Sequence, residues 1–269
     1  MLSELATRHA VLQAAAREAG QLARRYFAAR DTLQTTQKGI QDLVSEADRN
    51  VEALLIERLG RLFPTDGFLG EESGARGNRE QLWVIDPIDG TNNFLRGIRY
   101  WAVSVAYVQE GVAELGVVYD PMADELYAAR RGFGATRNGE PIRASEGAEL
   151  SRAVIGFTYA RAHPAEYYAQ AVRRLLASEG EYRRLGSAAL MLAYVAEGRI
   201  DGFYGSHLNS WDVLAGLVLT REAGAWSNDF LAGDGLWRGN TVMSCAPSLR
   251  AELAGILEAA GLPTAGPVR

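Results

Sequence analysis

The sequence contains a single cysteine, Cys245, among 269 residues. One cysteine excludes an intramolecular disulfide, and its position in the run from Thr241 to Ala246 is typical of a buried strand thiol. The chain also has no long apolar run and no charged leader followed by an apolar segment. We therefore expect a cytoplasmic protein without a membrane partner.

Histidine and positive charge are scarce as well. The chain has three histidines, and its 28 Lys and Arg stand against 33 Asp and Glu, which gives a formal net charge of -5. Binding to a nucleic-acid backbone requires clustered Lys and Arg, so this balance argues against a nucleic-acid partner. We assign no role to His9 or His163. His207 lies close in sequence to Trp211 and Asp212, but a structural or exposed histidine is the simpler interpretation.

What the chain does have is a group of acidic residues next to a short apolar run. The run Trp83 to Ile85 leads into the segment Asp86 to Thr91, in which Pro87 fixes its own backbone and Gly90 can adopt conformations closed to other residues. This pattern predicts a tight turn that holds two carboxylates, and such oxygens suit a hard cation such as Mg²⁺. The alternative is an ordinary capped loop, because Asp-Pro and Asp-Gly are common turn dipeptides.

Three further acidic elements lie elsewhere in the chain. Asp48 follows Ser45 at the start of an amphipathic stretch, Glu71 and Glu72 follow a short apolar piece, and Asp212 opens a helical pattern. Each also has a structural interpretation. Asp48 can belong to a capping box, one of the adjacent glutamates can be solvated surface, and Asp212 can complement a helix dipole.

Taken together, these elements resemble the inositol monophosphatase family of Mg²⁺-dependent, lithium-sensitive phosphatases. The similarity runs from the region of Lys38 to Gly224 and is most specific in the segments 86–94 and 211–216. It implies that metal ions are bound by Glu71, Asp86, the carbonyl oxygen of Ile88, Asp89 and Asp212. It further implies that Glu71 and Thr91 orient the attacking water, with Asp48 hydrogen-bonded nearby, and that Glu72 is a bystander.

The implied cofactor is Mg²⁺, with two ions per site, a weaker third ion shared between Glu71 and water, and inhibition by Li⁺ and Ca²⁺. A phosphate monoester is doubly charged, so cations must neutralise its phosphoryl oxygens before water can attack. Two ions can do this, one by lowering the pKa of the attacking water and the other by stabilising the leaving alkoxide. Such chemistry needs no Cys or His nucleophile.

The resemblance also supplies a set of substrate-binding positions, some shared with the metal site. These are Asp89, Gly90, Thr91, Gly186, Ser187, Ala188, Gly205 and Asp212. At one of them the chain departs from the family, because Gly205 stands where inositol monophosphatases have a glutamate that binds substrate hydroxyls. Losing such a charged hydrogen bond weakens discrimination by about 1 to 3 kcal/mol. Inositol preference is therefore open, although Ser206 or His207 could compensate.

Hydrophobic periodicity predicts helices near residues 2–29 and 46–62, strands between 82 and 130, and alternating strands and helices from 154 to 260. We interpret residues 1–145 as an α+β half carrying most metal ligands, and 146–269 as an α/β half carrying Asp212 and substrate contacts. The resemblance implies a layered αβαβα sandwich of the inositol monophosphatase and fructose-1,6-bisphosphatase type. Because Asp212 must meet Asp86 and Asp89, we expect rigidly packed halves with the site between them.

The function that we expect is hydrolysis of a small phosphate monoester, with inositol monophosphate as the leading substrate. Histidinol phosphate, a sugar bisphosphate and a nucleotide 3′-phosphate are alternatives with the same chemistry. A catalytically idle metal- or phosphate-binding regulator is an alternative from another class. The resemblance also implies a homodimer, and the apolar stretch Trp101 to Tyr107 is a candidate for its interface, although it could equally belong to the core.

Overall fold

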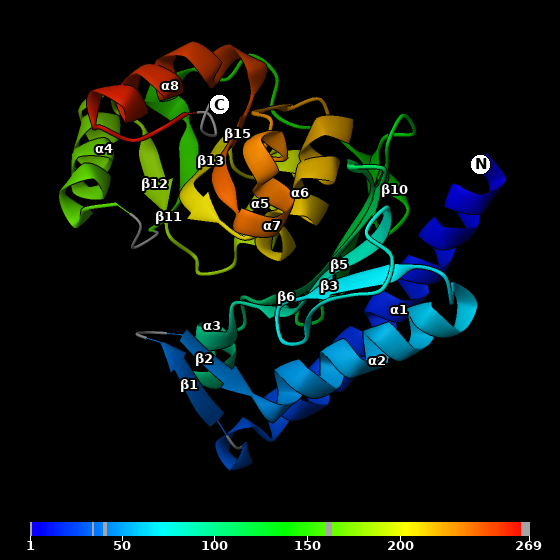
Figure 1. Ribbon diagram of the computed structural model, residues 1–269. Helices are drawn as coiled ribbons and strands as arrows, with labels where there is room; N and C mark the ends of the chain where they lie inside the picture. The colour runs from blue at the N-terminus through cyan, green and yellow to red at the C-terminus, as the bar shows by residue number, and fades with distance from the viewer. Residues whose placement is uncertain (1, 34, 40–41, 160–162, 265–269) are drawn as a thin grey trace.

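The computed structural model describes residues 2–33, 35–39, 42–159 and 163–264, which stack in five layers (Figure 1). Two long helices, α1 and α2, cover one face of an eight-stranded sheet, and α5 and α6 lie between its other face and a five-stranded sheet. Helices α4 and α8 cover the far face of the second sheet. This is the layered αβαβα arrangement that the family resemblance implied.

The helices and strands have the following bounds. The helices are α1 Leu2–Ala28, α2 Glu46–Leu62, α3 Thr91–Leu95, α4 Ala165–Ala177, α5 Ala188–Glu197, α6 Ser210–Glu222, α7 Gly235–Arg238 and α8 Arg250–Ala259. The strands are β1 Thr35–Gly39, β2 Asp42–Ser45, β3 Gly67–Gly70, β4 Gly74–Arg76, β5 Gln81–Asp89, β6 Ala102–Gln109, β7 Val112–Asp120, β8 Glu125–Arg130, β9 Ala135–Arg137, β10 Glu140–Ile142, β11 Val154–Thr158, β12 Glu181–Arg183, β13 Gly202–Leu208, β14 Trp226–Ser227 and β15 Asn240–Cys245. Among the described residues, none of the helices combines the length and apolar character needed to cross a bilayer.

The two large sheets differ in how their strands run. The first has the order β10-β9-β8-β7-β6-β5-β3-β4, and its pairs are antiparallel except for β3 with β5. The second has the order β12-β11-β13-β15-β14, with β12, β11 and β13 parallel and the other pairs antiparallel. Along the chain, the first sheet ends at Ile142 and the second begins at Val154.

Strand β6 illustrates how one strand serves two layers. Val103, Val105 and Tyr107 pack in the cluster that contains α1 and α2, whereas Ala106 and Val108 pack in the cluster that contains α5 and α6. Side chains alternate between the two faces of a strand, so a strand with apolar residues on both faces places the sheet between two cores. The second cluster also includes residues of both sheets, which packs the two halves against each other.

The position of β6 also shows whether the stretch from Trp101 to Tyr107 belongs to the core or to a dimer interface. Trp101 and Tyr107 are 0% and 1% exposed, and β6 lies between β5 and β7 in the middle of the sheet. The suggestion that the stretch from Trp101 to Tyr107 forms part of a dimer interface is therefore wrong. Its apolar and aromatic character belongs to the core.

A buried ion pair fastens α1 to this sheet. The Arg8 guanidinium donates to the Asp66 carboxylate through Nη2 at 3.0 Å and Nε at 3.3 Å, and the indole N–H of Trp83 donates to the same carboxylate at 2.9 Å. The guanidinium also lies 4.4 Å from the centre of the Phe63 ring. Every charge in this cluster thus has a partner, which is the condition under which burying a charge is tolerated.

Candidate active site

The site is built around a bulge near the end of β5. Asp86 pairs with Ser104 and Asp89 with Ala102, so three steps along β5 match two along β6. Such an irregularity interrupts the alternation of side chains and can direct two nearby residues to the same side. The predicted tight turn is thus wrong in form, because the strand continues through Asp89. It is right in placing Asp86 close to Asp89.

Electrostatics show which other acids surround this bulge. Burial raises the pKa of Asp86 well above its usual range, and the nearby negative charges of Glu71, Asp89 and Asp212 raise it further. Burial likewise raises the pKa of Asp89 to about 6. Burial, followed by the charge of Asp89, raises the pKa of Asp212 to about 7. The structure therefore gathers the four predicted acidic ligands from both halves of the chain.

Two of these acids also have structural roles. The Asp212 carboxylate accepts the backbone N–H of Asn209 at 2.8 Å and completes a capping box at the start of α6. The Asp89 carboxylate accepts the Ser187 hydroxyl at 2.5 Å and the Ala189 N–H at 2.6 Å. Asp89 thereby ties the end of β5 to the start of α5 across the two halves.

Asp48 and Thr91 meet at the edge of the acidic cluster. Thr91 Oγ1 lies 3.0 Å from an Asp48 carboxylate oxygen and 3.0 Å from the Ile88 carbonyl oxygen, and its single proton can serve only one of them at a time. Asp48 also accepts the Ser45 hydroxyl and backbone N–H at 2.6 and 2.8 Å, so it does cap α2. Burial raises the pKa of the Asp48 carboxyl. The capping role and the link to Thr91 therefore coexist in one side chain.

Two glycines let the halves come together at this point. Gly90 has φ 103° and a Cβ there would lie 3.1 Å from the Gly186 carbonyl oxygen, while Gly186 has φ 90°. Both positive φ values favour glycine. Asn93 completes the junction, because its side-chain amide donates to the carbonyl oxygens of Tyr100 at 2.8 Å and Leu185 at 2.7 Å. Asn93 stands inside the specific segment 86–94, but the sequence pattern alone does not mark it as part of the site.

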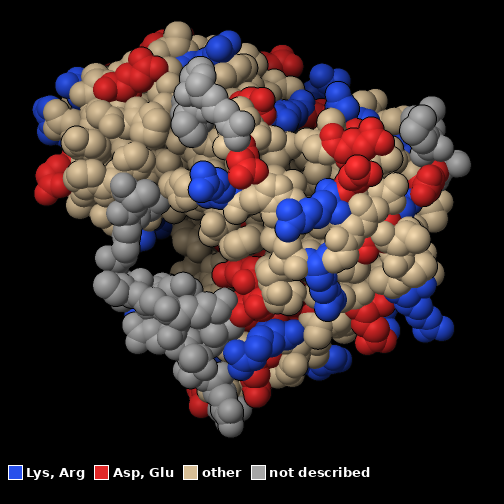
Figure 2. Space-filling view, in the orientation of Figure 1, with Lys and Arg blue, Asp and Glu red and all other residues tan. Residues whose placement is uncertain are grey.

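An open cleft of about 610 Å³ lies over this junction and includes the predicted substrate positions Asp89, Gly186, Ser187, Ala188 and Asp212. In Figure 2 the surface is hollowed at the left of the view, between the upper and lower parts of the molecule. The remaining lining residues are Asn92, Asn93, Arg96, Thr158, Tyr159, Arg184, Leu185 and Leu208. The two arginines were not anticipated, since isolated surface arginines carry no recognisable sequence signal. His207 is exposed and is not among the lining residues.

Gly205 lies behind one wall of this cleft. It pairs with Thr158 and Val242 in the middle of the second sheet, and it is buried. A Cβ at this position would lie 2.8 Å from Thr158 Cγ2 and 3.1 Å from Leu208 Cγ. Both of these residues line the cleft, so a longer side chain at 205 would point toward it. In this chain, Leu208 and Thr158 occupy the space that such a side chain would need.

The acidic cluster suits a hard cation in the chemistry of its donors, because carboxylate and carbonyl oxygens are the ligands that Mg²⁺ prefers. Within the described residues, however, no three His, Cys, Asp or Glu side chains are already arranged to hold an ion. The hydrogen bonds of Asp89 to Ser187 and Ala189 give a reason, since they engage one oxygen of this carboxylate. The residue types therefore fit, and binding would require side-chain adjustments.

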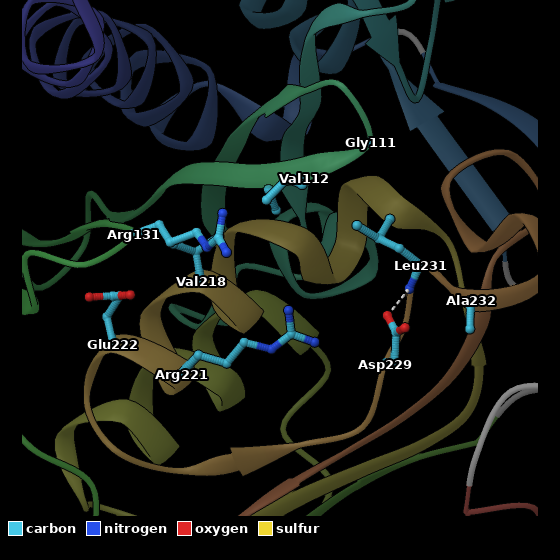
Figure 3. Close-up of a pocket in the computed structure, with 10 residues that line it drawn as sticks. Gly111, Val112, Arg131, Val218, Arg221, Glu222, Asp229, Leu231 and Ala232 are labelled. Carbon is cyan, nitrogen blue, oxygen red and sulfur yellow. Dashed lines mark hydrogen bonds between the residues drawn. The ribbon is translucent and has the colours of Figure 1, made fainter. Parts of the chain in front are cut away.

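A second cavity, of about 480 Å³, lies at the opposite end of α6 (Figure 3). Arg131 and Arg221 line it together with Asp229 and Glu222. Glu222 accepts the backbone N–H groups of the turn at residues 132–134. With two cations against two anions, this cavity has no excess of either charge, and we assign it no part in the chemistry.

Comparison with known proteins agrees with this geometry. The sequence model of the inositol monophosphatase family matches residues 4–261. The chain is 40% identical to "Nus factor SuhB" of Escherichia coli K12, over 89% of this chain and 92% of that protein. It is 44% identical to "Inositol-1-monophosphatase" of Rhizobium meliloti, over 80% of this chain and 83% of that protein. The crystal structure of the extragenic suppressor protein suhB from Bartonella henselae superposes with a TM-score of 0.87 at 37% identity, covering 92% of this chain and 97% of that one.

Proposed function

The chain belongs to the inositol monophosphatase family, and on this premise we propose that it hydrolyses a small phosphate monoester with the help of Mg²⁺. The observation that carries the proposal is the group of four neighbouring acids in which Asp86 is buried among Glu71, Asp89 and Asp212. Uncompensated carboxylates raise one another's pKa and are costly to bury. A bound divalent cation would remove this cost.

In the proposed mechanism, Mg²⁺ would be held by Glu71, Asp86, the Ile88 carbonyl oxygen, Asp89 and Asp212. Bound there, the ions would supply the charge that neutralises the phosphoryl oxygens and activates water. The chain's own groups would position the reactants. Thr91 and Glu71 would orient the attacking water, and Asp48 would hold the Thr91 hydroxyl in place through the 3.0 Å contact.

The leading substrate is an inositol monophosphate, supported by the relative of that name in Rhizobium meliloti. In this proposal the sugar or inositol hydroxyls lie against Gly186, Ser187 and Ala188, and the phosphate lies against Gly90 and Thr91. Gly205 keeps histidinol phosphate, a sugar bisphosphate and a nucleotide 3′-phosphate open as alternatives. A wall of Leu208 and Thr158 offers no acceptor carboxylate for a pair of hydroxyls.

A second candidate function is a role without catalysis. It is favoured by one observation, that similar proteins from Escherichia coli and Salmonella typhimurium carry the name "Nus factor SuhB", which describes a factor and not an enzyme. The set of acids argues for catalysis, because capping α6 and tying β5 to α5 account for Asp212 and Asp89 but not for a further carboxylate, Asp86, buried beside them. The two roles can also coexist in one protein. For the same reason, the expected absence of a nucleic-acid partner stays a prediction.

The direct test is release of inorganic phosphate from a panel of esters. Inositol 1-phosphate, histidinol phosphate, fructose 1,6-bisphosphate, a nucleoside 3′-phosphate and glycerol 2-phosphate would each be assayed with Mg²⁺, with EDTA, and with Mg²⁺ plus Li⁺ or Ca²⁺. We expect Mg²⁺-dependent hydrolysis of at least one ester, inhibited by Li⁺ and Ca²⁺. No hydrolysis of any ester by correctly folded protein would favour the non-catalytic role.

We also propose a cytoplasmic homodimer, by analogy with the family. With β6 excluded as the interface, another surface must supply the contact. Light scattering at micromolar concentration would show a mass near twice 29.2 kDa for the dimer. A mass near that of one chain would contradict it.

A further inference from the structure

A buried glutamate on α2, Glu52, has no part in the site described so far. It is 2% exposed, and its two carboxylate oxygens accept the backbone N–H groups of Glu72 and Ser73, each at 2.9 Å. These two amides belong to the turn that joins β3 to β4, and this turn begins with Glu71. The Glu52 carboxylate thus binds the backbone immediately after Glu71, a proposed metal ligand.

The surroundings of Glu52 are shaped to admit it. Gly70, the residue before Glu71, has no side chain, and a Cβ there would lie 2.5 Å from the Glu52 carboxyl carbon. Among the described residues, the carboxylate oxygens have these two amides as hydrogen-bond partners. Burying a carboxylate in this way is costly unless it is well hydrogen-bonded. The two hydrogen bonds to the turn therefore offset the cost of burying Glu52.

Glu52 also stands in a specific relation to Asp48. The two are four residues apart on α2, so they lie on the same face of the helix, one turn apart. Like charges at this spacing disfavour a helix, and here both are buried, at 1% and 2% exposure. Asp48 contacts Thr91, whereas Glu52 holds the turn after Glu71. One helix face therefore contacts Thr91 and the turn that begins with Glu71, and both Thr91 and Glu71 are proposed to orient the attacking water.

We propose that Glu52 is a positioning residue that sets the backbone of Glu71 relative to Asp86 and Thr91. This inference rests on the proposed function, since it assigns Glu52 to the same metal site. With the turn held at two amides, the Glu71 side chain starts from a fixed point beside Asp86. Partners that orient metal ligands typically contribute about 10- to 100-fold to metal affinity. Glu52 would act through the backbone of its neighbour and would not touch metal or substrate.

The test uses Glu52→Gln and a matched control, Glu57→Gln, on the same helix. The glutamine side chain in Glu52→Gln keeps the size of the glutamate, but its single amide oxygen can accept only one of the two N–H groups in the original geometry. Glu57 is exposed, and its carboxylate accepts from Arg58 at 3.1 Å and not from the amides of the turn. A second variant, Gly70→Ala, leaves Glu52 intact but pushes its carboxylate away from the turn.

Two readouts would be taken on each full-length variant. Amide hydrogen exchange reports whether the N–H groups of Glu72 and Ser73 lose protection. Isothermal titration with Mg²⁺ alone reports metal affinity. We expect Glu52→Gln and Gly70→Ala to exchange faster at these two amides and to bind Mg²⁺ about 10- to 100-fold more weakly, with wild-type values for Glu57→Gln. We also expect kcat to fall more than KM rises.

The outcomes separate the two proposals. If the wild-type protein binds Mg²⁺ and Glu52→Gln binds it equally well while only its melting temperature falls, Glu52 is a structural residue and the inference is overturned. Unchanged protection of the two amides in Glu52→Gln would overturn it as well. If the wild-type protein itself binds no Mg²⁺, the proposed function fails, whereas the exchange data would still show whether Glu52 holds the turn.

Discussion

Two groups of buried carboxylates in this molecule have opposite surroundings. The Asp66 side chain is fully buried beside β5 and meets the Arg8 guanidinium and the Trp83 indole N–H. Asp86, further along the same strand, is 2% exposed and is surrounded by the negative charges of Glu71, Asp89 and Asp212. Both groups carry the cost of burying charge. For Asp66 the chain itself supplies the compensating cation, whereas the neighbouring charges that raise the pKa of Asp86 are negative.

The difference separates a structural use of charge from a functional one. At Asp66 the charge is neutralised in the folded chain by Arg8. The cluster therefore fixes α1 on the sheet and has no net negative charge with which to attract a cation. At Asp86 the repulsion persists, and a divalent cation can relieve it. Sites arranged for function commonly have such a cost, which the rest of the fold must offset.

The largest expected effect comes from removing one charge from the acidic cluster around Asp86. Asp89→Asn should lower phosphatase turnover by several orders of magnitude, because an amide is a poorer ligand for Mg²⁺, while its oxygen can still accept from Ser187 and Ala189. Phosphate release and circular dichroism would be measured together. Asp229→Asn, on the exposed side of the second cavity, serves as the control. Near wild-type activity of Asp89→Asn, or of enzyme treated with EDTA, would refute the metal mechanism.

A change in the Arg8–Asp66 cluster should instead affect the stability of the fold. Arg8→Met leaves the Asp66 charge buried with Trp83 alone and should lower the free energy of unfolding by about 3 to 5 kcal/mol. Urea unfolding would measure this loss. Arg17→Met is the matched control, because its ion pair with Asp124 is exposed and such pairs contribute about 1 kcal/mol or less. A loss for Arg8→Met no larger than that for Arg17→Met would show that Asp66 is not compensated as described.

An acid can also be added to the cleft, at Gly205. The sequence alone predicts that Gly205→Glu improves the preference for inositol 1-phosphate over glycerol 2-phosphate about tenfold, or roughly 1.4 kcal/mol. The structure adds a condition, since Leu208 and Thr158 crowd the position. We therefore expect the single variant to be less stable and the double variant with Leu208→Ala to show the tenfold gain. Leu208→Ala alone is the control. An unchanged substrate ratio in a stable double variant would mean that position 205 does not reach the substrate.

The smallest effect should be a gain in stability. In EDTA, Asp86→Asn should raise the free energy of unfolding by about 1 kcal/mol, because it removes a buried charge from a repulsive group and keeps the oxygen that accepts the Ile88 N–H at 3.0 Å. Asp66→Asn, tested alongside by urea unfolding, should instead lower it. A loss of stability in both variants would remove the distinction between the two groups.

The sequence allowed much of this site to be predicted. Chemically distinctive residues stood in specific segments, so the proximity of the acids at 71, 86, 89 and 212 was anticipated, whereas their roles stay predictions. The layered fold followed from the family resemblance and agrees with the structures of relatives. Apolar periodicity also located most of the longer elements, among them α2 at Glu46–Leu62 and β11 at Val154–Thr158.

What could not be predicted depends on tertiary contacts. The bulge in β5 exists only in pairing with β6, and the sequence Asp-Pro-Ile-Asp favours a turn when considered alone. The central place of β6 in the sheet, which rules out Trp101–Tyr107 as an interface, likewise depends on strand order. Glu52 carries no motif of its own. Its role emerges only when α2 is placed against the turn that contains Glu71.

Thermal unfolding of the wild-type protein as Mg²⁺ is added to EDTA-treated samples tests the central claim most directly. If the buried acids around Asp86 bind Mg²⁺, the melting temperature should rise with the Mg²⁺ concentration and then level off, because a ligand that binds only the folded state stabilises it. The rise should be absent in Asp89→Asn and absent when NaCl of equal ionic strength replaces Mg²⁺. A melting temperature that does not respond to Mg²⁺, or responds equally to NaCl, would contradict the account.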